Sequence, residues 1–324
     1  MNKIGRLRIS TAIGYLSAAR ARPNLRISAN TLTRRLLVEH GGVVGVEVER
    51  DGQFETIRGR VIVLSAGAIQ SPAILLRSGI GPRAEVERHG ITLVRETPGV
   101  GASFSDHPAL AVAATVKDPA LLDPDQPIVQ TILRYTAPGS DQRNDLQIEA
   151  FSFSPRSGSL SAFAVAAVLE QANSKGTLTL ASADPHDAPL IRQNMLTDER
   201  DMTRLMGCFR DCMTFMDTGP MAGLIDRVIF PTAERELSDA ALRGLLSRFA
   251  ASGFHPCATA KMGPATDPLA VVDQYGRAHG IEGLVVADAS IMPTVPRANT
   301  NLTTIMIGEM VGEWLRTQPG LYGL

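Results

Sequence analysis

The chain has 324 residues, 44% hydrophobic and 20% charged, with a formal net charge of −1. The length allows two domains, and the near-neutral charge gives no basis for binding nucleic acid or an anionic membrane. The longest apolar run, "SAFAVAAVL", is shorter than the ~18 residues of a membrane span. The amino terminus has no apolar segment typical of a secretory signal, and three cysteines are too few for a disulfide framework. We therefore expect a cytoplasmic protein.

The first third of the chain is expected to contain several strands and one helix. Alternating valines in "VVGVEVER" precede Asp51-Gly52, a dipeptide typical of a hairpin turn because both turn positions need positive φ. The β-branched run "RVIVLSAG" (residues 60–67) indicates a buried strand. "AIQSPAILLRSG" (68–79) indicates a helix with Pro72 in its first turn.

The pattern changes between residues 109 and 250. "DLQIEAFSF" and "GTLTLASAD" alternate with period two and favour an antiparallel sheet. Cys208 and Cys212 lie four residues apart in a predicted helix, residues 198–216, and we interpret them as core thiols rather than metal ligands. The apolar face expected for this helix consists of Met202, Leu205, Met206, Phe209, Cys212, Met213 and Met216.

After residue 250 the small residues and buried strands of the opening return. "GLVVADAS" predicts a strand ending at Asp288, and "NLTTIMIGEMVGEWLR" predicts an amphipathic helix. We therefore expect one domain built from residues 1–108 and 251–324, with a second domain, 109–250, inserted. The apolar face expected for the last helix consists of Leu302, Ile305, Met306, Met310 and Trp314.

"GIGPRA", residues 79–84, formally satisfies the dinucleotide-binding pattern G-x-G-x-x-G/A. That pattern binds phosphate only where a strand leads in and a helix leads out. Here a helix is expected to lead in, and Pro82 lacks an N–H group. We interpret this match as chance.

Several long segments together resemble the glucose–methanol–choline (GMC) flavin oxidoreductases, in the order of that family. They are "SAGAIQSPAILLRSGIGP", "PGVGASFSDHP", "KGTLTLASADPHDAPLIRQNML", "FHPCATAKMG" and "GLVVADASIMPTVPRANTNLTTIMIGE". The resemblance implies a mixed α+β and α/β fold, with an FAD-binding domain built from both chain ends and an inserted antiparallel substrate domain. It also implies hydride transfer from an alcohol carbon to flavin N5, with oxygen or a quinone-like acceptor.

The resemblance implies specific roles for residues of these segments. His255 matches the catalytic histidine, and Asn299 its partner, which the family supplies as histidine or asparagine. Asp288 would bond a ribityl hydroxyl, and the Ala289 N–H would reach phosphate. Alternatives stay open, since Asp288 and Asn299 could each serve as a helix cap.

Further cofactor contacts are expected from three places. The start of the last helix, with Thr300 and Asn301, would face the flavin N1–C2=O edge. Asp106 and His107 would lie in a loop against the flavin. Gly67 and Ala68 would let the backbone approach the adenine side, with packing as the alternative reading.

The chain also departs from the family pattern. Ala258 and Ala260 replace residues that are commonly Gly or Cys, and the family's opening strand–GxGxxG–helix unit is not found. We therefore expect an FAD-binding domain incomplete at its amino terminus, binding FAD weakly unless a partner segment supplies the diphosphate loop. Two other functions stay open: a hydroxynitrile-lyase-like flavoprotein, and an inactive fragment that binds such a segment.

Overall fold

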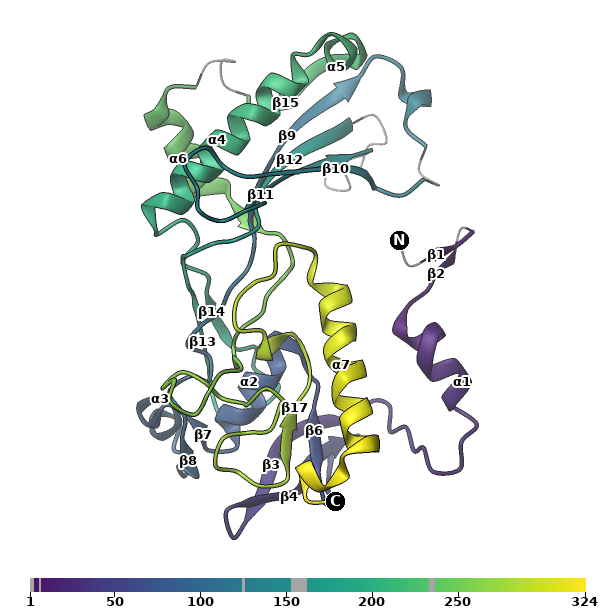
Figure 1. The fold of residues 1–324 in the computed structure, drawn as a ribbon, viewed down its shortest axis with the longest axis vertical. Helices are drawn as coiled ribbons and strands as arrows, with labels where there is room; N and C mark the ends of the chain where they lie inside the picture. The colour runs from purple at the N-terminus through teal and green to yellow at the C-terminus, as the bar shows by residue number, and fades with distance from the viewer. Residues whose placement is uncertain (1–2, 6, 124–125, 153–161, 233–236) are drawn as a thin grey trace.

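The computed structural model describes residues 3–5, 7–123, 126–152, 162–232 and 237–324. Buried apolar side chains form two separate cores. The lower core in Figure 1 draws mainly on residues from both chain ends, and the upper core on the middle of the chain. Phe153, at the end of the predicted strand "DLQIEAFSF", and Ser161, at the start of the apolar run "SAFAVAAVL", lie outside the described residues.

An antiparallel sheet of three strands lies at the bottom of the lower core. It consists of β3 (Leu32–Glu39), β4 (Gly42–Arg50) and β5 (Gln53–Arg58). The hairpin between β4 and β5 is confirmed, because Asp51 and Gly52 have φ angles of 51° and 73°.

A parallel pair of strands forms the centre of the lower core. β6 (Ile62–Leu64) pairs with β17 (Leu284–Val286), although 222 residues separate their first residues in the chain order. All of β17 is buried, as predicted. The prediction that β6 is buried throughout is wrong at Val63, which is 41% exposed. Among the described residues β6 pairs on one side only, so its other edge is open.

Helix α2 (Gly67–Arg77) follows β6 and packs into the lower core. Pro72 lies in the interior of this helix and not in its first turn, which corrects the prediction. Its missing N–H leaves the carbonyl of Ala68 without a helical partner. The hydroxyl of Thr259 donates to that carbonyl at 2.6 Å. The helix therefore tolerates Pro72 because another segment supplies the donor.

The structure supports the interpretation of residues 79–84 as a chance match. Helix α2 leads into them, and the six-residue helix α3 (Arg83–Arg88) follows Pro82. Ile80 and Gly81 form the short strand β7, which pairs with β8 (Arg95–Glu96). No long helix starts here to receive a phosphate.

The upper core is an antiparallel sheet covered on one face by helices, as Figure 1 shows. Its strands run in the order β10, β11, β12, β9, β15, and β16 also pairs with β9. Three helices pack with this sheet around the upper core: α4 (Glu199–Met216), α5 (Gly219–Leu224) and α6 (Asp239–Phe249). The strands are β9 (Pro108–Val116), β10 (Val129–Tyr135), β11 (Leu146–Phe151), β12 (Ala162–Leu169), β15 (Ile225–Phe230) and β16 (Ala251–Ser252).

Two sequence predictions for the middle of the chain have different outcomes. The buried face of α4 is confirmed, except that Met213 is only half-buried. Strands β13 (Thr177–Thr179) and β14 (Leu190–Arg192) do not join the large sheet. Leu178 and Leu180 pack in the lower core, so this part of residues 109–250 belongs with the chain ends.

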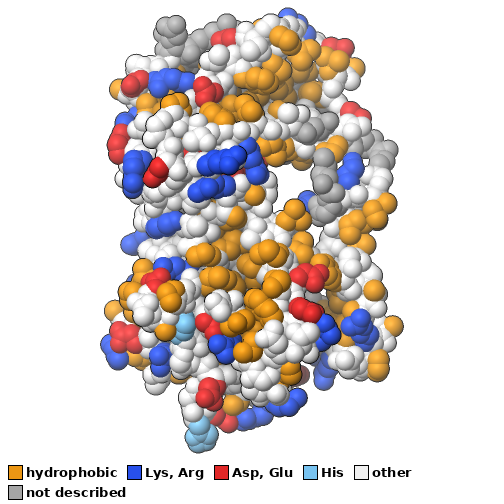
Figure 2. Space-filling model, in the orientation of Figure 1, with side chains coloured by type: hydrophobic (Ala, Val, Ile, Leu, Met, Phe, Trp, Pro, Cys, Tyr) orange, Lys and Arg blue, Asp and Glu red, His pale blue; other side chains and the backbone are white. Residues whose placement is uncertain are grey.

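The chain closes with two short 3-10 helices and one long helix. They are η4 (Ala289–Ile291), α7 (Thr300–Thr317) and η5 (Pro319–Tyr322). Ile307 and Val311 are the apolar side chains of α7 that are buried. The prediction is wrong for Leu302, Met306 and Met310, which are 69%, 54% and 42% exposed. Figure 2 shows hydrophobic side chains gathered on this face of the molecule.

The amino-terminal arm lies beside α7 and outside both cores (Figure 1). It contains β1 (Lys3–Ile4), β2 (Leu7–Arg8), a π-helical turn at Ala12–Leu16 and α1 (Ser17–Ala19). A hydrogen bond to Glu309 of α7 raises the pKa of Tyr15, so the arm contacts that helix.

Candidate active site

Two histidines from distant parts of the chain meet between the two cores. His107 directly precedes β9, and His255 lies in the segment after β16. Their Nδ1 atoms are 3.0 Å apart, and the rings meet edge to face with centroids 4.9 Å apart. The side chain of His107 is fully buried, whereas His255 is half-buried. His255 is therefore the member of the pair that a substrate can reach.

The hydrogen bonds around the pair determine which nitrogen of each ring carries the proton. Burial lowers the pKa of His107 to about 4, so this ring is neutral near pH 7. Its Nε2 lies 2.9 Å from the carbonyl oxygen of Pro296, which can only accept, so the proton is on Nε2. The Nδ1 of His107 must then accept from the Nδ1–H of His255. This leaves Nε2 of His255 without a proton, as a base requires.

Asp106 holds the backbones of both histidines in place. Its Oδ1 accepts from the backbone N–H of His107 at 2.7 Å and from that of His255 at 3.0 Å. Its Oδ2 accepts from the hydroxyl of Ser252 at 2.5 Å. Burial lowers the pKa of His255, and the Asp106 carboxylate offsets part of this effect.

The side chains of Asp106 and His107 offer a flavin almost no surface. Asp106 is 5% exposed and His107 0% exposed, and both are engaged by protein groups. The expected place of these loop residues against the flavin stays a prediction.

The side-chain amide of Asn299 lies within hydrogen-bond distance of Nε2 of His255, the ring nitrogen that faces away from His107. Its Nδ2 is 3.2 Å from Nε2 of His255, and its side chain is exposed. Asn299 occupies the N-cap position of α7, but its side chain makes no capping hydrogen bond. The amide is therefore not engaged by the helix, and it contacts the ring of His255 instead. The first N–H groups of this 18-residue helix also lack a side-chain cap, and they give this end of the site a positive potential.

Thr300 and Asn301 form the first turn of α7 and differ in exposure. Thr300 is 9% exposed, whereas Asn301 is exposed. The predicted cofactor contacts of both residues stay predictions, with the backbone N–H groups of this turn as the donors that can serve a ligand.

The carboxylate of Asp288 connects the ends of the two parallel strands. Its Oδ2 accepts from the N–H of Gly67 at 2.9 Å and from the hydroxyl of Ser71 at 2.5 Å. Its Oδ1 accepts from the N–H of Ser290 at 2.7 Å, so Asp288 caps η4. With three protein donors and 3% exposure, the side chain holds Gly67, Ser71 and Ser290 in place. A direct ribityl contact stays a prediction.

Gly67 and Ala68 differ in what they offer a ligand. Gly67 has φ +85°, and no atom lies within 4 Å of where a Cβ would stand, so its backbone borders open space. Ala68 is 6% exposed, and its carbonyl accepts from Thr259, which favours the packing alternative for this residue. The N–H of Ala289 has no acceptor among the described residues and is partly exposed.

The two alanines that depart from the family pattern are fully buried. Ala258 has φ +65°, a conformation that favours glycine, and its N–H donates to the carbonyl of Ala289 at 3.2 Å. The N–H of Ala260 donates to the carbonyl of Ser290 at 2.9 Å. Neither methyl group is on the surface.

Glu170 is a site residue that the sequence analysis missed. It follows β12, is 1% exposed, and places Oε2 3.8 Å from Nε2 of His107. This Oε2 has no hydrogen-bond partner among the described residues. Burial raises the pKa of the carboxyl to about 7. A lone Glu after an apolar strand carries no motif, so nothing in the sequence singled it out.

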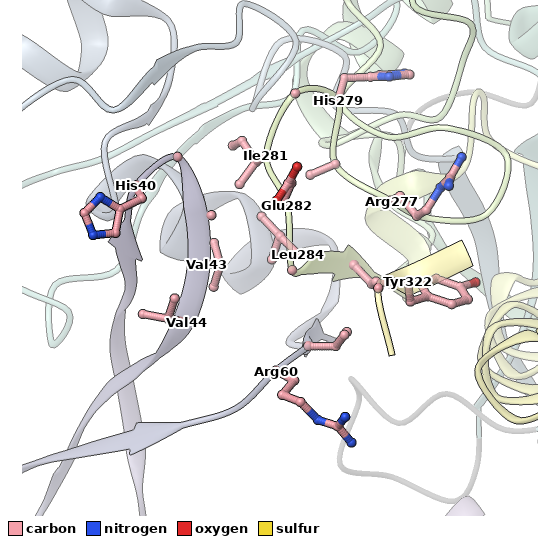
Figure 3. A pocket seen from close by; sticks show the side chains of 18 of the residues that line it. His40, Val43, Val44, Arg60, Arg277, His279, Ile281, Glu282, Leu284 and Tyr322 are labelled. Atoms are coloured by element: carbon pink, nitrogen blue, oxygen red, sulfur yellow. The ribbon is translucent and has the colours of Figure 1, made fainter. Parts of the chain in front are cut away.

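A cleft of about 960 Å³ lies elsewhere, at the amino ends of β6 and β17. Figure 3 shows Arg60, Glu282, Arg277 and Tyr322 around it. The lining residues include none of the predicted site residues, which gather at the carboxyl ends of these strands. The cleft is therefore separate from the histidine site.

The described residues offer neither a metal site nor a membrane-spanning helix. No group of three or more His, Cys, Asp or Glu side chains there could hold a metal ion. None of the helices described is long and apolar enough to cross a membrane.

Comparison with sequence families matches the chain to GMC oxidoreductase. The N-terminal profile matches residues 3–109 and the C-terminal profile residues 172–308. The 5-(hydroxymethyl)furfural oxidase of Methylovorus sp. (strain MP688) is 36% identical, covering 97% of this chain and 62% of that protein. Oxygen-dependent choline dehydrogenase 1 of Chromohalobacter salexigens is 35% identical, covering 95% and 60%. The chain thus spans less than two thirds of these relatives.

Comparison with solved structures gives the same family of folds. The pyridoxine 4-oxidase from Mesorbium loti superposes with a TM-score of 0.89 at 25% identity, covering 98% of this chain and 63% of that one. An FAD-dependent oxidoreductase from Chaetomium thermophilum has a TM-score of 0.85 at 21% identity, covering 97% and 65%. The second similarity concerns the fold alone.

Proposed function

Since the chain belongs to the GMC oxidoreductase family, we propose that it carries out FAD-dependent oxidation of a small-molecule alcohol, with His255 as the base. The observation that carries this proposal is the 3.2 Å contact between Nε2 of His255 and the Asn299 amide. The hydrogen bonds of the histidine pair imply that this Nε2 carries no proton. The relatives named above are oxidases and a dehydrogenase, which favours oxidation over lyase chemistry. The final electron acceptor is oxygen or a quinone-like compound.

Three features of the chain fit FAD. Gly67 borders open space, the N–H of Ala289 lacks an acceptor among the described residues, and the start of α7 has no side-chain cap. Gly67 and the N–H of Ala289 suit the sugar and phosphate groups of FAD. The amino-terminal end of α7 suits the edge of the flavin ring that becomes negative on reduction. When bound, FAD supplies the two-electron acceptor for the hydride.

The chain's own residues prepare the alcohol for oxidation. Nε2 of His255 accepts the hydroxyl proton, because an alkoxide releases hydride more readily than a neutral alcohol. The Asn299 amide donates to the same oxygen and holds it in place without adding charge. Asp106 and His107 keep the ring of His255 oriented with its proton on Nδ1.

A further segment completes the cofactor site in this proposal. It carries the diphosphate-binding loop, belongs to this polypeptide or another, and pairs with the open edge of β6. The unpaired edge, the 41% exposure of Val63 and the greater length of the relatives support it. We expect the 324-residue chain alone to lose FAD on gel filtration, and the added segment to restore retention. Full retention of FAD by the chain alone would contradict this part of the proposal.

The three cysteines are buried and form no disulfide, which suits a cytoplasmic protein.

Alcohol-dependent bleaching of bound flavin tests the function. FAD-loaded protein is mixed with a panel of primary and secondary alcohols without oxygen, and the visible flavin band is followed by stopped flow. We expect at least one alcohol to bleach the band, and the carbonyl product to appear in equal amount. Loaded protein that no alcohol reduces would overturn the proposal.

A further inference from the structure

We propose that Glu170 is a positioning residue for this oxidation, acting on His255 through His107. The inference rests on the proposed function. It assigns Glu170 the task of stabilising the positive charge that the histidine pair acquires when His255 takes the alcohol proton. The three residues then form a chain of contacts from the end of β12, through His107, to the ring of His255.

The position of Glu170 leaves its carboxylate few partners. Its backbone N–H donates to the carbonyl of Asp145 at 2.8 Å, which anchors the residue at the end of β12. Oε2 then lies 3.8 Å from Nε2 of His107, with no hydrogen-bond partner among the described residues. A buried charge without a partner is costly, so an ionised Glu170 favours a positive charge on its neighbour.

Other charged groups of the same sheet also face Glu170. Arg134 of β10 lowers the pKa of Glu170, and Glu149 of β11 raises it, while burial is the largest effect and raises it. Arg134 also lowers the pKa of His107. The Nε of Arg134 donates to Oε1 of Gln147 at 2.8 Å, and Nε2 of Gln147 donates to Oε1 of Glu149 at 2.6 Å. The side-chain amide of Gln147 thus connects Arg134 to Glu149. Oε2 of Glu170 makes no such hydrogen bond among the described residues, and the nitrogen that lies 3.8 Å from it is Nε2 of His107.

The proton balance shows where Glu170 acts. The alcohol O–H bond breaks, an N–H bond forms at Nε2 of His255, and the O–H electron pair stays on oxygen. The histidine pair gains one positive charge, which the short Nδ1···Nδ1 contact lets His107 share. In a buried site this charge lowers the basicity of His255 unless a nearby negative charge offsets it. Above about pH 7, where its carboxyl is ionised, Glu170 provides that negative charge from the far side of His107.

The first test measures flavin reduction by an alcohol against pH in FAD-loaded protein. In Glu170→Gln the isosteric amide keeps the packing but removes the charge. The carboxyl of Glu170 is ionised only above about pH 7, so its charge acts on the plateau at high pH. We expect the rate of Glu170→Gln to be close to the parent's below pH 7 and to fall to about one tenth of the parent's above it. A packing defect would lower the rate by the same factor at every pH. A ratio of variant to parent rates that does not change across pH 7 would overturn the proposal.

Two further variants control this test. Glu170→Asp keeps the charge and withdraws it by one methylene, so its plateau should lie between those of the parent and Glu170→Gln. Glu149→Gln removes a half-buried carboxylate from the same sheet that makes no contact with His107, and should keep the parental plateau. If Glu149→Gln lowers the plateau as much as Glu170→Gln, the specific role of Glu170 is wrong.

A second test needs no catalysis. Nitrogen NMR of ¹⁵N-histidine-labelled chain reports the tautomer and pKa of each ring. We expect the ring signals of His107 and His255 in the parent to change near pH 7, where Glu170 ionises, and this change to be absent in Glu170→Gln, with the exposed His186 alike in both. Coinciding curves for parent and variant would overturn the coupling. A change near pH 7 in protein that no alcohol reduces would leave the coupling standing while the proposed function fails.

Discussion

The hydroxyl of Thr259 donates a 2.6 Å hydrogen bond to the backbone carbonyl of Ala68, and both groups are buried. Pro72 has no N–H to offer this carbonyl, so Thr259 supplies the only donor that the surrounding chain gives it among the described residues. The contact connects α2 to the segment that carries His255. The hydrogen bond that α2 lacks at Pro72 is thus replaced by one that holds the segment carrying His255 against the helix.

Replacing Thr259 by valine tests this contact. Thr259→Val keeps the shape but leaves a buried carbonyl without a donor, which should lower the free energy of unfolding by about 1–3 kcal/mol. Urea denaturation followed by circular dichroism measures the change. Thr259→Ser, which retains the hydroxyl, should lose less. Equal stability of the parent and the valine variant would show that water or another group satisfies the carbonyl.

His255→Ala tests the proposed base. We expect the rate of flavin reduction to fall by about 10² to 10⁴, the usual contribution of a positioned acid–base group. FAD content should change little, because the imidazole faces the substrate side. His186→Ala is a matched control, since His186 is an exposed histidine paired with Glu49. Reduction of the His255 variant at the parental rate would make His255 structural.

Asn299 is expected to tolerate histidine better than leucine. A polar group at this position can hold the substrate oxygen, whereas leucine cannot. In loaded protein Asn299→His should keep measurable turnover, and Asn299→Leu should lose most of it. The stability of α7 should hardly change in either variant, because Asn299 makes no capping hydrogen bond through its side chain. Equal turnover of the two variants would remove Asn299 from the site.

The stability of the protein should depend on pH through two opposing groups. Burial lowers the pKa of His107 from 6.5 to about 4, so the unfolded chain binds more protons in this window, and stability is lost as pH falls through it. Burial raises the pKa of Glu170 from 4.5 to about 7, so the folded chain binds more protons there, and stability is lost as pH rises. Between pH 4.5 and 6.5 the two slopes offset each other.

Glu170→Gln should therefore expose the slope that His107 contributes. We expect the urea midpoint of this variant to rise with pH between 4.5 and 6.5 more steeply than that of the parent. His107→Gln should show the reverse, a midpoint that falls more steeply with rising pH. Parallel curves for the parent and both variants would contradict the burial of these groups as titrating sites.

Local patterns predicted several elements because their causes are local. Asp51 and Gly52 form the hairpin turn since only such residues adopt positive φ cheaply. Helix α4 buries the face that its spacing indicates, since it packs on one sheet only. His255 and Asn299 could be singled out from a resemblance in long motifs, and the structure brings them to 3.2 Å.

The tertiary structure decided what the sequence by itself left open. Helix α7 carries apolar residues on more than one face, and periodicity does not tell which face meets the core. Ile307 and Val311 are buried, and Leu302 is exposed.

The electrostatics of the site are likewise a result of the fold. His107 and His255 are 148 residues apart in sequence, and Glu170 carries no motif. Only the packing of the two cores places a buried carboxylate behind a neutral histidine. The sequence by itself indicated several elements, the family and His255 as the proposed base, whereas the tautomer and charge environment of His255 depend on contacts between distant segments.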